Sequence, residues 1–194
     1  MKPAAVIYAT RDGHTRRIAE AIAGGLGKHG VASTLIDLSE RPAADGLDGF
    51  DSAVIAVPVR MGRHPRQVEA FVREHRSELA RLPSAFVSVS LSEAGAQRAE
   101  STAARRAKFA SYLGRCNEHF FKRTGWHPAH VKNVAGALAY SRYGMTLRLA
   151  MKYFARRCGA STDASRDYEY TDWAALDGFV AMWAKELLAQ RPVR

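Results

Sequence analysis

The 194-residue chain has few cysteines, no long hydrophobic run and no cluster of metal-ligand residues. Its two cysteines, Cys116 and Cys158, lie outside any Cys-x-x-Cys or His/Cys cluster. We therefore expect no metal site and no disulfide framework, and we interpret both cysteines as buried apolar residues in a reducing compartment. No apolar run approaches the roughly 18–20 residues of a membrane span, and no signal peptide is recognisable at the start. We expect one domain over residues 1–194, located in the cytoplasm.

Acidic residues are scarce in the middle of the chain. The formal net charge is +10. Residues 98–157 contain 13 Lys or Arg but only two acids, Glu100 and Glu118, whereas charges elsewhere nearly cancel. A positive field concentrated in this way predicts an anionic partner. The region has no aromatic-interleaved pattern of an RNA-binding surface, so we expect no nucleic acid.

Short apolar runs alternate with helical patterns along the whole chain. Expected strands cover residues 6–9, 32–38, 53–57, 85–89 and 131–138. Expected helices cover residues 14–28, 65–81, about 97–122 and 171–190, the last with an N-cap at Thr171 or Asp172. This alternation predicts an α/β fold, a doubly wound five-stranded parallel sheet in the order 2-1-3-4-5. Ligands bind such sheets at the carboxyl ends of strands, here in the loops after strands one, three and four.

The loop after the first strand has the residue types of a phosphate cradle. Hydroxyl groups, a glycine and a following helix N-terminus favour an oxyanion, and the candidate binding residues are Thr10, Arg11, Asp12, Gly13, His14 and Thr15. The pattern resembles the phosphate loop of flavodoxins, with Asp12 in place of the middle Thr. It lacks the glycines of a dinucleotide fingerprint and the Gly-Lys-Ser/Thr of a P-loop. Because a carboxylate repels phosphate, we expect Asp12 to order an arginine (Arg11, Arg16 or Arg60) or to cap the helix.

The two other loops at this edge offer contacts for a planar ring. The third strand leads into Pro58, Val59, Arg60, Met61 and Gly62, and the fourth into Ser90, Leu91 and Ser92. A response regulator would need an Asp at the end of strand three, where this chain has Val57-Pro58. The seven histidines are scattered; we expect most at the surface and only His14 near a ligand.

A long connection, about residues 139–170, separates the fifth strand from the last helix. Inside it, residues 143–157 predict an amphipathic helix. One face carries Tyr143, Leu147, Ala150, Met151 and Phe154, and a basic stripe carries Arg148, Lys152 and Arg156, followed by Arg157. Such a helix suits an anionic membrane surface. The alternative is that its apolar face packs on the domain.

Four segments together resemble the menaquinone-dependent protoporphyrinogen oxidase family, which consists of flavodoxin-like FMN enzymes of bacterial haem synthesis. These segments are Thr10-Arg-Asp-Gly-x-Thr-Arg16, Pro83-Ser-Ala-Phe-x-Ser-Val89, Ala135-Gly-Ala-Leu-x-Tyr-x-Arg-Tyr143 and Tyr170-Thr-Asp-Trp173. His14 stands where the family pattern has Gln, and Ser141 where it has Pro.

The resemblance implies FMN, protoporphyrinogen IX as the substrate, menaquinone or ubiquinone as the electron acceptor, and a peripheral location on the cytoplasmic face of the inner membrane. Because the flavin carries the chemistry, no catalytic side chain is expected. For the substrate carboxylates we expect Arg142 and one or more of Arg98, Arg105 and Arg106. An FMN-dependent NAD(P)H:quinone oxidoreductase and a flavodoxin-type electron carrier remain alternatives.

Overall fold

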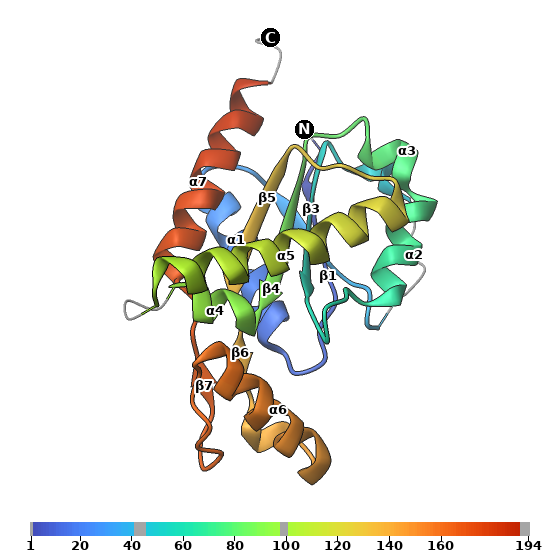
Figure 1. The fold of residues 1–194 in the computed structure, drawn as a ribbon. Helices are drawn as coiled ribbons and strands as arrows, with labels where there is room; N and C mark the ends of the chain where they lie inside the picture. The colour runs from blue at the N-terminus through green and yellow to red at the C-terminus, as the bar shows by residue number, and fades with distance from the viewer. Residues whose placement is uncertain (1, 41–45, 98–100, 191–194) are drawn as a thin grey trace.

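Five parallel strands form the centre of the molecule. The computed structural model describes residues 2–40, 46–97 and 101–190 (Figure 1). The strands are β1 (Ala4–Tyr8), β2 (Ser33–Asp37), β3 (Ser52–Pro58), β4 (Ser84–Ser90) and β5 (His130–Ala135). Their order is β2-β1-β3-β4-β5, which confirms the predicted topology.

Helices cover both faces of the sheet, so the inner strands are apolar on both sides. In β1, Val6 and Tyr8 pack in one core with α1 (His14–Lys28) and α7 (Trp173–Ala189). The alternate residues Ala5 and Ile7 pack in a second core with α2 (Arg66–Glu74) and α5 (Ala103–Thr124). This two-sided burial explains the nearly continuous apolar runs that predicted the strands.

Several predicted boundaries were wrong. The helix expected over residues 65–81 is two helices, α2 and α3 (Arg76–Leu79), and a short helix α4 (Leu91–Gln97) precedes α5. The expected fifth strand also divides at Gly136: β5 ends in the sheet, and β6 (Ala137–Leu138) pairs antiparallel with β7 (Tyr168–Glu169). The apolar pattern continues across the break because β6 enters another hydrophobic core.

The segment between β5 and α7 folds on its own small core beside the sheet. This insertion contains β6, β7 and α6 (Met145–Cys158), and its buried centre includes Leu138, Tyr140, Tyr143 and Ala155. Figure 1 shows it at the end of the molecule opposite the two termini, next to the end of β4 where α4 begins. At its return to the domain, Asp172 caps α7 by accepting a hydrogen bond from the Ala175 amide at 2.9 Å, as predicted.

We expect Gly25→Ala to destabilise the fold, because the α1–α7 contact has no room for a methyl group. A Cβ at Gly25 would lie 2.8 Å from Val180 Cγ1, whereas a Cβ at Gly24 would meet nothing within 4 Å. Urea unfolding should show a loss of about 1–3 kcal/mol for Gly25→Ala. The control Gly24→Ala, in the same helix, should be neutral or gain up to about 1 kcal/mol. Equal stability of the two variants would contradict this packing.

Candidate functional site

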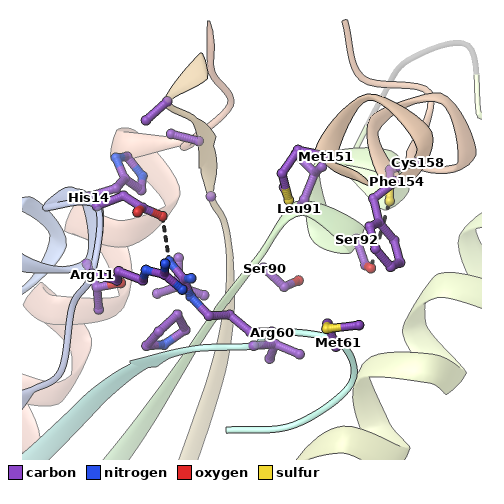
Figure 2. Close-up of a pocket in the computed structure, with 18 of the residues that line it drawn as sticks. Arg11, His14, Arg60, Met61, Ser90, Leu91, Ser92, Met151, Phe154 and Cys158 are labelled. Atoms are coloured by element: carbon purple, nitrogen blue, oxygen red, sulfur yellow. Dashed lines mark hydrogen bonds and ion pairs between the residues drawn. The ribbon is translucent and has the colours of Figure 1, made fainter. Parts of the chain in front are cut away.

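A cavity of about 320 Å³ opens at the carboxyl ends of β1, β3 and β4, where the topology predicted a ligand site. Figure 2 shows Arg11, His14 and Arg60 on one side of it and Met151, Phe154 and Cys158 on the other. Twelve of the predicted cofactor-binding residues line it: Thr10, Arg11, Asp12, His14, Thr15, Pro58, Val59, Arg60, Met61, Ser90, Leu91 and Ser92. The other two, Gly13 and Gly62, shape the adjoining turns.

The loop between β1 and α1 presents unpaired donors at the start of a helix. Gly13 adopts a left-handed conformation (φ 84°), and its amide donates to Thr10 Oγ1 at 3.0 Å. The hydroxyl of Ser39 on the next connection holds the backbone of Thr10 through bonds of 2.9 Å to its amide and carbonyl. Within the part of the chain that the structure describes, no side chain caps α1, so its first amides remain available. This arrangement suits a phosphate group.

Asp12 orders an arginine, as predicted, and the partner is Arg60. Arg60 Nη2 lies 2.5 Å from Asp12 Oδ2, which joins the loops after β1 and β3 at the edge of the cavity that both residues line. Arg142 of the insertion approaches from another side and donates to the Asp12 carbonyl at 2.7 Å. A Cβ at Gly13 would lie 2.9 Å from Arg142 Nη1, so a side chain there would displace this guanidinium, and the positive φ of Gly13 also favours glycine.

His14 is held by the segment that returns from the insertion. Its Nε2 lies 2.7 Å from Thr171 Oγ1, and that hydroxyl donates to the Ala135 carbonyl at 2.8 Å. Because the Thr171 hydroxyl hydrogen is used in the bond to Ala135, His14 Nε2 must donate to Thr171 Oγ1. In the neutral ring, Nδ1 therefore carries no hydrogen. Burial lowers the pKa of His14, which favours that neutral form. The edge of the Trp173 ring packs against the imidazole.

A tight hairpin follows β3 and presents Met61 at the cavity mouth. Arg60 and Arg63 exchange backbone hydrogen bonds of 2.8 and 3.0 Å, and both residues between them, Met61 and Gly62, have positive φ. Met61 is 86 % exposed. A methionine in the left-handed region is uncommon, so this turn is held in place by its surroundings.

His64 anchors that hairpin in the core, which the sequence analysis did not anticipate. It is buried against the rings of Phe86 and Phe120, with Nε2 3.3 Å from Asn117 Oδ1. Burial lowers the pKa of His64 to about 4, so the ring is neutral at physiological pH. His75 is also buried, so His64 and His75 are the two histidines that depart from the surface position expected for most of the seven.

The predicted polar loop after β4 is the first turn of α4. Ser90 Oγ accepts the Glu93 amide at 3.2 Å, and the Ser90 carbonyl accepts the Gly136 amide at 2.9 Å. Leu91 and Ser92 therefore begin a helix at the cavity wall. Their amides belong to its first turn, where no intrahelical acceptor exists.

The insertion supplies the apolar wall opposite the phosphate loop. Tyr143 and the α6 residues Leu147, Met151, Phe154 and Cys158 line the cavity. Most of these side chains belong to the apolar face that was expected to lie on a membrane surface. The alternative, packing on the domain, is the one observed. The four α6 residues follow the spacing i, i+4, i+7, i+11 of one helix face, and that spacing could have predicted this wall. No such pattern in the sequence points to Tyr112 of α5, which also lines the cavity.

The residues of the predicted basic stripe of α6 differ in how deeply they are buried. Arg148 is half-buried and donates to the Tyr140 carbonyl at 3.0 Å, and a membrane contact by this residue stays a prediction. Lys152 is also half-buried, whereas Arg156 and Arg157 are exposed. The outer face instead exposes Met145 (81 %), Leu149 (64 %) and Tyr153 (59 %), spaced four residues apart.

The residues predicted for substrate carboxylates are dispersed. Arg105 borders a second cavity between α5 and α6. Arg106 and Arg142 line neither cavity, because Arg106 faces solvent on α5 and Arg142 is bonded to the phosphate loop. Arg98 lies outside the described residues. A direct substrate contact by any of these residues stays a prediction.

The sheet order, the donor-rich loop at the start of α1 and the apolar cavity beside it are those of a flavodoxin-type protein. The chain belongs to the flavodoxin family: the model of the flavodoxin domain matches residues 5–165. Among solved structures, a short-chain flavodoxin associated with a bacterial microcompartment is similar, with a TM-score of 0.55 and 17 % identity over 96 % of this chain and 99 % of that one. A Streptococcus pneumoniae flavodoxin has a TM-score of 0.51 and 15 % identity over 97 % and 99 %.

Curated relatives extend the similarity through the insertion. A protoporphyrinogen IX dehydrogenase [quinone] of Leishmania major is 30 % identical over 96 % of this chain and 77 % of its own length. The enzyme of the same name from Escherichia coli K12 is 29 % identical over 90 % of both chains. Within the described residues, no helix is long and apolar enough to cross a bilayer.

Proposed function

We propose that the chain is an FMN-dependent enzyme that oxidises protoporphyrinogen IX to protoporphyrin IX and passes the electrons to a membrane quinone. The observation that carries this proposal is the similarity to dehydrogenases of that name over nearly the whole chain, insertion included. The fold alone would be equally consistent with an electron carrier. The insertion is part of the cavity wall, so it belongs to the proposed site rather than to a separate module.

The residues of the cavity fit FMN. One oxyanion cradle at the start of α1 matches a single phosphate group, and Arg60 balances the charge of Asp12 beside it. The apolar surface between the β3 hairpin and α6 suits a flat ring system. Bound there, FMN supplies two-electron redox chemistry. The chain contributes position, an apolar wall that excludes water, and the neutral His14 at the cavity edge.

The redox balance requires three turnovers per substrate molecule. Protoporphyrinogen loses six electrons and six protons, in three two-electron steps, and each step reduces one quinone to its quinol. Since quinones reside in the bilayer, we propose that the protein attaches peripherally to a membrane. The exposed apolar residues Met145, Leu149 and Tyr153, flanked by Arg156 and Arg157, support this attachment.

The function is tested by changing the electron donor. The purified protein, reconstituted with FMN under anaerobic conditions, should form fluorescent protoporphyrin from protoporphyrinogen when a quinone is present. Omission of the quinone should stop product formation after the bound flavin is reduced. NADPH should be a poor donor. Quinone reduction by NADPH, without porphyrinogen oxidation, would instead support the NAD(P)H:quinone oxidoreductase alternative.

We expect Thr15→Val to weaken FMN binding by about 10- to 100-fold. Thr15 is buried in the first turn of α1, and a donor to a charged group contributes about 1.5–3 kcal/mol. Quenching of FMN fluorescence measures the affinity. The control Thr34→Val removes an exposed hydroxyl on β2, away from the cavity, and should bind FMN normally. Unchanged affinity of Thr15→Val would place the phosphate elsewhere.

We expect the double variant Leu149→Ser, Arg156→Glu to lose most sedimentation with anionic vesicles. It removes one exposed apolar anchor and reverses one exposed cation on the outer side of α6. Turnover with a long-chain quinone in vesicles should fall, while turnover with a short water-soluble quinone should persist, because neither residue lines the cavity. Lys185→Glu on α7 is the charge-matched control. Vesicle binding equal to that of wild type at low salt would exclude this surface as the attachment site.

A further inference from the structure

A second cavity, of about 670 Å³, lies between α5 and α6 and adjoins the first. The two share Ser92, Tyr112, Phe154 and Cys158 as lining residues. Figure 2 shows Ser92, Phe154 and Cys158 together at this boundary. A molecule in the second cavity would therefore reach the wall of the proposed flavin site. We call the second cavity the vestibule.

The lining of the vestibule combines aromatic rings with cations. Arg105, Lys108 and Arg115 come from α5, and Arg157 comes from α6. Phe109, Tyr112 and Phe154 provide the aromatic surface, and no described lining residue is acidic. This combination fits an apolar molecule with carboxylates at its edge. It concentrates four cations of the basic region at a single site.

The cations are positioned by neutral partners and retain free donors. Arg105 Nη2 donates to the Arg157 carbonyl at 3.1 Å and lies over the Phe109 ring. Arg157 Nη1 donates to Tyr153 Oη at 3.0 Å, and Arg115 Nη1 to Ser111 Oγ at 2.7 Å. Each guanidinium has five N–H groups, so most remain available for a bidentate contact with a carboxylate.

The vestibule depends on a close approach at Gly95 of α4. A Cβ there would lie 2.6 Å from the Cys158 carbonyl and 2.7 Å from the Phe109 ring. Absence of a side chain lets α5 and α6 both pack against α4, with their lining residues on either side of the vestibule. The site is thus built by three helices, two of which come from outside the insertion.

We infer that the vestibule binds the carboxylate-bearing edge of the tetrapyrrole, with Lys108, Arg115, Arg105 and Arg157 holding the carboxylates and the aromatic residues contacting the macrocycle. This assignment rests on the proposed function. It differs from the expectation for Arg106 and Arg142, which line neither cavity.

The test uses the FMN-loaded protein and protoporphyrin IX as a fluorescent probe. The double variant Lys108→Gln, Arg115→Gln should raise the Kd for protoporphyrin about tenfold or more and raise the KM for protoporphyrinogen, with FMN affinity unchanged. The control Lys122→Gln, Lys185→Gln removes two exposed charges outside the vestibule and should match wild type. Arg105→Gln is a second, independent variant with the same expected direction.

A neutral probe separates charge recognition from general apolar binding. The dimethyl ester of protoporphyrin lacks both carboxylate charges, so it should bind wild type more weakly and respond little to the double variant. Wild-type Kd and KM in both vestibule variants would overturn the assignment, even if the protein oxidises protoporphyrinogen. Charge-dependent porphyrin binding without porphyrinogen oxidation would instead support the vestibule and contradict the proposed function.

Discussion

The contact between Arg142 and the loop after β1 is the constraint on which the site depends. The guanidinium donates to the Asp12 carbonyl in a position where a Cβ on residue 13 would lie 2.9 Å from its Nη1. The same glycine provides the positive φ that turns the chain into α1. Gly13 therefore shapes the loop after β1 and also leaves room for Arg142 of the insertion. A larger side chain at residue 13 would disturb both.

Further contacts fasten the insertion to α1 from its other end. Thr171 holds His14, and Arg17 pairs with Glu169 while lying over the Trp173 ring. The segments on both sides of the insertion therefore converge on the first turns of α1. Since the loop after β1 leads into that helix, the same set of contacts also holds the insertion in place relative to this loop.

The two sides of helix α6 have different surroundings. Its inner side, from Leu147 to Cys158, borders the cavity, and its outer side leaves Met145 and Leu149 exposed to solvent. The basic region is likewise divided among roles: Arg142 and Arg148 bond to backbone carbonyls, whereas Arg105 and Arg157 border the vestibule. Net charge signalled an anionic partner, but only the distribution of these side chains indicates where such a partner would bind.

The sequence by itself determined the local features of this protein. The bounds of α1, the cap at Asp172 and the five parallel strands follow from short-range patterns, because capping, backbone conformation and two-sided burial act over a few residues. Only the tertiary structure decided what covers each apolar face and which arginine meets which acceptor. The break at Gly136, the burial of His64, the inward side of α6 and the convergence of α5 and α6 on Gly95 depend on segments distant in sequence. The spacing of apolar residues shows that one face of a helix or strand is apolar. It does not show which surface packs against that face.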